Sequence, residues 1–155
     1  MSPSPAPRDL HAEVALRLSV LDQRYTASRR ALVDVLAAAG RPLSIPEILA
    51  AADSVPQSSA YRNVTTLIEA SVLRRVAGTD ANGRFELAED LAGHHHHLIC
   101  TSCGRVLDVD AAPRLERALA EAAADIARAH GFDVVDHRID LVGVCASCQR
   151  QATAG

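Results

Sequence analysis

HHHHLICTSCGRVLDV, residues 94–109, separates two parts of this 155-residue chain that differ in character. It contains the pair Cys100-x-x-Cys103, and a second pair, Cys145-x-x-Cys148, follows after an interval of 41 residues. Four thiolates are the ligand set of a closed tetrahedral zinc site, and each CxxC turn brings two sulfurs to one side of the metal. We therefore expect Cys100, Cys103, Cys145 and Cys148 to hold a structural zinc.

The interval between the two cysteine pairs is longer than the loop of a simple zinc ribbon, so a folded unit must fill it. Pro113 is suited to open a helix and Gly131 to end it, and apolar residues recur between them at helical spacing. Alternation in residues 132–144 then suggests strands that lead back to the second pair. The alternative of a thioredoxin-like redox pair lacks its βαβ context. These features predict a small α/β domain whose two ends the zinc ties together.

The first half of the chain has the periodicity of helices followed by a hairpin. Apolar spacing predicts one helix from Leu10 to Leu21, a second that stops at Gly40, a third capped by Ser44 and a fourth over residues 58–73. Residues 72–87 resemble two extended segments joined by a turn rich in Gly, Asp and Asn. The predicted fold class is therefore α+β, with an N-terminal winged helix-turn-helix followed by the small α/β domain.

In a winged helix-turn-helix, the second helix of the helix-turn-helix pair enters the major groove of DNA, and residues in its first turns contact base edges. The residues in that position are Ser58, Ser59, Tyr61 and Arg62. Further contacts to the DNA backbone or the minor groove are expected from the start of the preceding helix, at Arg24, Thr26, Arg29 and Arg30. Two plainer interpretations stay open: a half-buried core tyrosine at position 61, and a merely solvated arginine face.

Charge is unevenly distributed along the chain. Residues 1–84 hold ten arginines and eight acids, a net +2, whereas residues 85–155 hold six arginines and eleven acids, a net −5. Every basic residue is arginine, the side chain best suited to bidentate contact with phosphate and guanine. Neither a secretory signal nor a membrane-spanning run is evident, so we expect a cytoplasmic protein in which paired cysteines bind metal rather than form disulfides.

The four histidines at 94–97 would face alternately if they lie in a strand. His95 and His97 would point one way and His94 and His96 the other, so one strand could serve two metal sites. A purification tag and a surface histidine cluster without metal are the alternatives; tags, however, are usually longer and terminal.

With these motifs in place, the chain resembles the ferric uptake regulator family from about Leu21 to Cys148. The resemblance is carried by AYR at 60–62, FEL at 85–87, HHHHLICTSCG, HGF at 130–132, His137 and the final CASC. It implies a homodimer that binds a palindromic double-stranded operator when loaded with metal, and that represses genes of metal homeostasis. It also implies that the C-terminal domain is the dimerisation domain.

The resemblance further implies two metal sites besides the structural zinc. A regulatory site maps onto Glu86, His95, His97 and Asp108, and a third site maps onto His94, His96 and His137. The carboxylate of the third site is expected from the long helix, with Glu116 as first candidate and Glu121 as substitute. Iron or zinc is the expected regulatory metal, followed by manganese or nickel, since nitrogen and oxygen ligands suit all four.

Two positions depart from the family pattern. A regulatory histidine is common just before the third helix, where this chain has Pro42 or Leu43. His11 could be recruited instead, although a solvated helix-surface histidine is the plainer interpretation. Glu86 stands where the zinc-sensing branch often has cysteine, which again favours nitrogen and oxygen ligands.

The expected domain boundaries are 1–87 for the winged helix, with 1–8 disordered, 88–93 for a hinge linker, 94–150 for the metal-binding dimerisation domain and 151–155 for a tail. We expect no enzyme: a zinc hydrolase would need a motif such as HExxH or HxE with PCxxC, and neither is present. Three alternative functions stay open: a peroxide-responsive regulator of the same family, a zinc-dependent hydrolase and a metal-storage protein.

Overall fold

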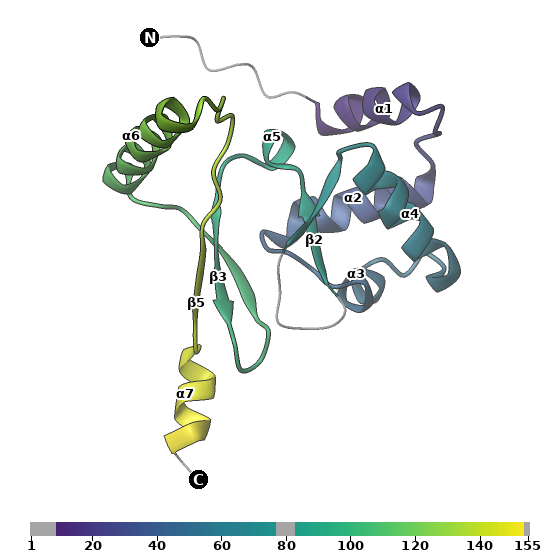
Figure 1. Cartoon of the computed structure of the whole chain (residues 1–155). Coiled ribbons are helices and arrows are strands. Elements are labelled where there is room, and N and C mark those ends of the chain that lie inside the picture. The colour runs from purple at the N-terminus through teal and green to yellow at the C-terminus, as the bar shows by residue number, and fades with distance from the viewer. Residues whose placement is uncertain (1–8, 77–82, 154–155) are drawn as a thin grey trace. The chain divides into compact units, whose positions relative to one another are not determined.

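The chain divides into two compact units between Gly93 and His94 (Figure 1). The structure, a computed structural model, describes residues 9–76 and 83–153. The expected disorder of residues 1–8 and the central part of the expected wing turn lie outside the described residues. Within the described ranges, no helix is both long and apolar enough to cross a membrane.

The first unit contains four helices, a two-stranded hairpin and a helical turn. Their bounds are α1 Leu10–Val20, α2 Ala27–Ala39, α3 Ile45–Ala51, α4 Gln57–Glu69, β1 Leu73–Val76, β2 Arg84–Leu87 and α5 Glu89–Ala92. β1 and β2 pair antiparallel, and Leu43 forms an isolated antiparallel bridge with Phe85 that adds a third element to the wing. The helices and the hairpin predicted for a winged helix are therefore present.

Local chemistry explains where these helices begin and end. The Thr26 side chain accepts the backbone N–H of Arg29 at the start of α2, and α2 stops at Gly40, whose φ of 58° favours glycine. Ser44 and Glu47 form a reciprocal capping box at the start of α3. The predicted stop at Gly40 and cap at Ser44 are thus confirmed.

One continuous core fills the first unit. Its fully buried side chains come from all four longer helices and from the segment entering β1, and they include Leu18, Leu32, Ile48, Leu67 and Val72. Burying one such side chain stabilises a fold by about 1.5–3 kcal/mol relative to leaving it exposed. The unit therefore has the apolar core expected of an independently stable domain.

The second unit is a three-stranded sheet with two helices. Its elements are β3 His96–Cys100, β4 Val106–Val109, α6 Pro113–His130, β5 Asp140–Gly143 and α7 Ala146–Thr153. The strand order is β4-β3-β5, with β3 antiparallel to β4 and parallel to β5. The alternating stretch 132–144 forms only one strand, and residues 151–153 continue α7, where the sequence suggested a tail.

Few apolar side chains of the second unit are buried. Ile99 and Val106 are buried, but none of the residues of α6, all of them described, is. Ile126 on α6 is 58% exposed, and Val135, in the stretch that does not form a strand, is 89% exposed. Residues 94–153, the described part of this unit, form no closed apolar core of their own.

Candidate metal centres and nucleic-acid interface

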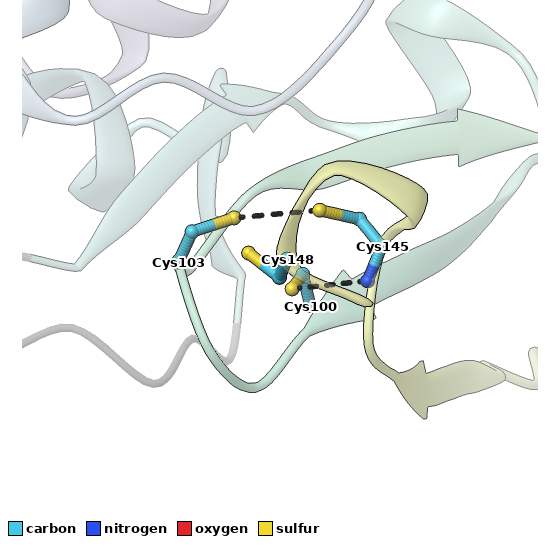
Figure 2. A group of neighbouring side chains, drawn as sticks. All are labelled: Cys100, Cys103, Cys145 and Cys148. Carbon is cyan, nitrogen blue, oxygen red and sulfur yellow. Dashed lines mark hydrogen bonds between the residues drawn. The ribbon is translucent and has the colours of Figure 1, made fainter. Parts of the chain in front are cut away.

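The four cysteines meet at one edge of the sheet of the second unit (Figure 2). Cys100 ends β3 and Cys145 follows the end of β5. Because β3 and β5 are parallel, their carboxyl ends lie at the same edge, and one CxxC motif is found at each of these ends. The parallel pairing therefore explains why cysteines so distant in sequence come together.

The geometry of this cluster suits a tetrahedral metal. The Sγ atoms of Cys103 and Cys145 lie 3.9 Å apart, close to the edge of about 3.8 Å expected for a tetrahedron with Zn–S bonds of about 2.3 Å. The backbone N–H of Cys145 donates to Cys100 Sγ at 3.3 Å. Gly104, with a φ of 70°, closes the first turn by donating to the Cys100 carbonyl at 3.0 Å. A side chain with Cβ would be strained there.

The thiols cannot all ionise easily without a cation between them. Hydrogen bonds from the Ser147 hydroxyl and the Cys148 backbone lower the pKa of Cys145 to about 6. Interactions with Cys145 and Cys103 instead raise the pKa of Cys148 to about 12. A divalent cation bound by all four sulfurs would remove this conflict, because it stabilises every thiolate at once.

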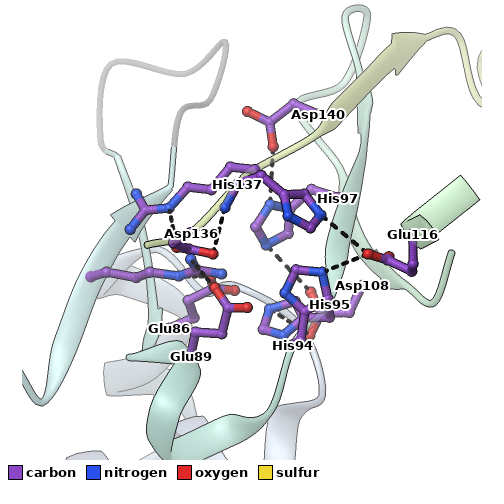
Figure 3. A network of polar contacts seen from close by, with 12 residues as sticks. Glu86, Glu89, His94, His95, His97, Asp108, Glu116, Asp136, His137 and Asp140 are labelled. Carbon is purple, nitrogen blue, oxygen red and sulfur yellow. Dashed lines mark hydrogen bonds and ion pairs between the residues drawn. The ribbon is translucent and has the colours of Figure 1, made fainter. Parts of the chain in front are cut away.

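A second cluster gathers three histidines around one carboxylate. Glu116 Oε1 lies 2.7 Å from His96 Nε2, and Glu116 Oε2 lies 3.1 Å from His137 Nε2 and 3.3 Å from His94 Nε2. Figure 3 shows Glu116 extending from α6 toward the labelled His94 and His137 rings. His94 lies just before β3 and His96 begins it, and their ring centroids are 4.8 Å apart. The structure thus brings together all four residues expected of the third site.

Glu116, rather than Glu121, occupies the carboxylate position of this cluster. Glu116 lies in the first turn of α6, and the hydrogen bond from His96 is the largest influence lowering its pKa. Five residues along a helix rotate a side chain by about 140° and advance it by about 7.5 Å, so Glu121 projects from another face.

A third cluster is formed by His95, which lies just before β3, His97 in β3 and Asp108 in β4. His95 and His97 stack edge to face with ring centroids 5.2 Å apart, as the alternation of a strand predicts. Asp108 is the register partner of His97 in β4. Its Oδ2 lies 3.9 Å from His95 Nε2, and its Oδ1 lies 3.9 Å from His97 Nε2. Three of the four residues expected of the regulatory site therefore converge within one unit.

Glu86, the fourth residue expected of the regulatory site, belongs to the first unit. It lies in β2 opposite Arg74 of β1, whose guanidinium forms an ion pair with it. Arg74 also reaches Glu89 of α5 at 3.5 Å, and Arg17 forms an ion pair with Asp90. The segment expected to be a hinge linker is thus a helical turn held to the winged helix by two arginines.

Sequence reasoning missed Asp140, whose Oδ1 lies 3.1 Å from His97 Nδ1. Asp140 begins β5 and is the register partner of His97 on the parallel side of β3. No signal in the sequence distinguished Asp140 from the remaining acidic residues of the C-terminal half.

The expected DNA-contacting residues of α4 lie at its exposed start. Tyr61 is 55% exposed, and Ser58 and Arg62 are exposed as well, while Ser59 is half-buried with its hydroxyl donating to the Pro56 carbonyl. The opposite face of α4 is buried in the core. The interpretation of Tyr61 as a half-buried core tyrosine is therefore wrong.

The arginines near the start of α2 have different surroundings. Arg24 and Arg30 are exposed, and Thr26 is exposed while capping the helix. Arg29, in contrast, is only 8% exposed and donates to Asn63 Oδ1, the Arg24 carbonyl and Gln23 Oε1. The expectation that Arg29 contacts DNA is corrected: its guanidinium is bound within the fold.

Both ring nitrogens of His11 contact residues outside the three candidate metal sites. Its Nε2 lies 3.1 Å from Asp34 Oδ1 and its Nδ1 lies 2.8 Å from the Tyr25 hydroxyl. Burial raises the pKa of Tyr25 to about 12, so this hydroxyl stays protonated. His11 joins α1 to α2, which argues against its recruitment as a metal ligand.

Comparison with known proteins gives consistent results. The model of the Ferric uptake regulator family matches residues 21–142. The ferric uptake regulation protein of Campylobacter jejuni is 34% identical over 94 residues, which cover 61% of this chain and 55% of that protein. That of Bacillus subtilis is 31% identical over 97 residues, covering 62% of each. The chain therefore spans little more than half the length of these relatives.

Solved structures share the fold. The ferric uptake regulator Fur of Helicobacter pylori, described as having three functional metal-binding sites, superposes with a TM-score of 0.72 at 22% identity, covering 96% of this chain and 97% of that one. A zinc-bound manganese uptake regulator superposes with a TM-score of 0.60 at 28% identity, covering 86% of this chain and 98% of that one.

Proposed function

Since the chain belongs to the ferric uptake regulator family, we propose that it is a metal-responsive, DNA-binding transcriptional regulator. It represses genes of metal homeostasis by binding a palindromic operator as a metal-loaded homodimer in the cytoplasm. The observation that carries this proposal is the occurrence, in one chain, of a winged helix with an exposed α4 and of a sheet bearing three separate donor clusters.

The cysteine cluster is the proposed site of a structural zinc ion, which stabilises the second unit. Four sulfur ligands complete a tetrahedron and leave no open coordination position, which is typical of structural rather than catalytic zinc. When bound, the ion would neutralise the thiolates and tie the end of β3 and the turn after it to Cys145 and to the start of α7. Cys100, Cys103, Cys145 and Cys148 are its proposed ligands.

The cluster of His95, His97 and Asp108 is the proposed regulatory site, and Glu86 is the proposed fourth ligand. Two nitrogens and carboxylate oxygens suit iron, zinc, manganese and nickel alike. Because Glu86 belongs to the winged-helix unit and the other three to the second unit, a metal bound by all four fixes the angle of the chain between the units. To bind the metal, the Glu86 carboxylate must then either leave Arg74 or bind Arg74 and the cation at the same time.

The proposed third site consists of His94, His96, Glu116 and His137. It joins the start of β3, the first turn of α6 and the segment before β5, so a cation there would hold α6 against the sheet. Its nitrogen and oxygen donors resemble those of the regulatory site, but all of them belong to one unit.

The homodimer is supported by the uncovered apolar side chains of the second unit. Ile126, Phe132, Val135 and Val142 are each more than half exposed. Where such side chains lie together, they mark protein–protein interfaces. A second copy of the same unit is the proposed cover.

The proposed mechanism is a metal-dependent restriction of geometry. Two recognition helices must sit about 34–36 Å apart, or a multiple of it, to read successive major grooves. Without metal the dimer would sample many distances between its two recognition helices, and DNA binding would have to select one of them at a cost in free energy. Metal that holds this distance near the required value would remove that cost and so increase the affinity for DNA. Ser58, Ser59, Tyr61 and Arg62 are then the proposed base-contacting residues. Arg24 and Thr26 are proposed to contact the DNA backbone or the minor groove.

The test is selection of duplexes from a randomised palindromic library, followed by binding titrations in buffered iron, zinc, manganese and nickel. His95→Ala with His97→Ala is expected to keep the cysteine-bound zinc and to abolish metal-stimulated DNA retention. His11→Ala is the control and is expected to keep the stimulation. Unchanged stimulation in the double variant would overturn the regulatory site, and metal-dependent hydrolysis without DNA retention would favour an enzyme instead. Loss of DNA retention after peroxide treatment of the iron-loaded protein would identify a peroxide-responsive regulator.

A further inference from the structure

We infer that Asp140 is a positioning residue of the regulatory site: it holds His97 in the tautomer and orientation that present Nε2 to the metal. This inference rests on the proposed function, since it concerns the same site. It adds a residue that does not itself contact the metal.

The sheet places three side chains in one row. His97 lies in the central strand β3, with Asp108 as its register partner in β4 and Asp140 as its register partner in β5. Register partners in neighbouring strands project from the same face, so both carboxylates flank one imidazole. Figure 3 shows His97 between the labelled Asp140 and Asp108.

The two carboxylates address different nitrogens of the same ring. Asp140 Oδ1 is 3.1 Å from Nδ1, a hydrogen-bond distance, whereas Asp108 Oδ1 is 3.9 Å from Nε2. The longer separation is too great for a hydrogen bond but is compatible with two ligands of one cation. Asp140 therefore contacts the nitrogen that faces away from Asp108.

This arrangement determines which nitrogen carries the proton. A carboxylate can only accept, so Nδ1 must donate to Asp140, which leaves the lone pair of a neutral ring on Nε2. A metal-binding histidine needs this state, and a carboxylate on its other nitrogen also raises its basicity as a ligand. Asp140 thus prepares His97 before any cation arrives.

Asp140 is unsuited to be a ligand of the same cation. The two nitrogens of an imidazole lie on opposite edges of the ring, and the oxygen of Asp140 is on the Nδ1 edge. The donor atoms of His95, His97 and Asp108 lie within 4.8 Å of one another in a group that does not include Asp140. Its role is therefore exerted through His97.

The experiment uses the full chain with the cysteine site loaded with zinc, in a His137→Ala background that disables the third site. Cobalt(II) is titrated against a competing chelator, and its visible absorption reports occupancy of the nitrogen–oxygen site. Asp140→Ala is expected to weaken cobalt binding by about 10–100-fold, the usual effect of removing a carboxylate that supports a histidine ligand. Asp140→Glu should recover most of the affinity, and Asp133→Ala, which removes an exposed carboxylate of the same unit, should leave it unchanged.

A second readout needs no metal in the regulatory site. Long-range ¹H–¹⁵N spectra of the histidine rings should show His97 protonated on Nδ1 in the parent protein and as a mixture of tautomers in Asp140→Ala. Equal cobalt affinity and an unchanged tautomer in Asp140→Ala would overturn the inference. Failure of His97→Ala to weaken cobalt binding would instead overturn the proposed regulatory site itself, so the two failures are distinguishable.

Discussion

The two units of this chain are stabilised in different ways. The first buries a continuous set of apolar side chains from four helices and a hairpin, and its buried arginine, Arg29, donates a hydrogen bond to Asn63 within the same unit. The second buries little apolar surface, leaves α6 uncovered, and instead gathers thiols, imidazoles and carboxylates in three clusters. The first unit thus has an apolar core that needs no metal, whereas the folding of the second unit would depend on bound metal.

The largest expected effect is loss of the cysteine-bound zinc. Cys148→Ser, or removal of zinc by a chelator, should unfold the sheet of the second unit, because structural zinc contributes on the order of 10 kcal/mol in small zinc domains. The first unit should remain folded. Hydrogen exchange resolved by peptide should therefore show β3 and β5 unprotected and α2 and α4 protected.

The matched control for that experiment is Ser102→Ala, which changes an exposed residue between two ligands and removes no sulfur. It should leave the exchange pattern as in the parent protein. Persistent protection of β3 after complete zinc removal would show that the second unit does not depend on metal, and the contrast between the units would fail.

The converse change tests the core of the first unit. Leu32 is fully buried in α2, so Leu32→Ala should destabilise the first unit by about 3 kcal/mol through lost apolar contacts and a residual cavity. Exchange should accelerate in α2 and α4 but stay unchanged in β3. Leu16→Ala, at a position 60% exposed, is the control and should cost less than about 0.5 kcal/mol.

Ile126 on α6 is one of the exposed apolar side chains proposed to form the dimer interface, and a charge at this position tests that proposal. Ile126→Glu is expected to raise the dimer dissociation constant at least about tenfold, since a carboxylate buried in an apolar interface loses its hydration. Sedimentation equilibrium measures this constant. Val20→Glu, on the 76%-exposed side chain in α1, should leave it unchanged; an equal effect of both variants would contradict dimerisation through the second unit.

The smallest expected effect is a pH dependence within the first unit. Burial acts to raise the pKa of Glu47, but hydrogen bonds from Ser44 and Arg41, together with the charge of Arg84, outweigh it and lower the pKa from 4.5 to about 2. A carboxyl whose pKa is lower in the folded state stabilises the fold above pH 4.5, and this stability disappears as the pH falls through 2.

Urea unfolding of the parent protein and of Glu47→Gln, measured at several pH values, tests this sign. Because the carboxylate is about a third exposed, solvent screening limits the difference at pH 7 to about 1 kcal/mol or less. The difference should shrink between pH 4.5 and 2. A difference that grows on acidification would contradict the assignment of Glu47 as an ionised, hydrogen-bonded cap.

Much of the site follows from local periodicity. The alternation of an extended segment predicts that His95 pairs with His97 and His94 with His96. Both ring pairs are found, although β3 itself begins only at His96. The cysteine spacing likewise predicts a four-sulfur cluster. The prediction for Arg29 is wrong because burial of an arginine depends on a distant partner, here Asn63, 34 residues away. The exposure of α6 could not be predicted either, because an apolar stripe on a helix does not indicate which element covers it.

By itself, the sequence determined the winged-helix order, the kinds of ligand available and the faces on which neighbouring histidines project, because helices and strands have fixed periods. Only the tertiary structure decided that Glu116 rather than Glu121 meets the histidines, that Arg74 pairs with Glu86, and that Asp140 supports His97. Those choices depend on strand register and helix placement. Register joins residues as far apart as His97 and Asp140, and no local pattern encodes which carboxylate arrives at which ring.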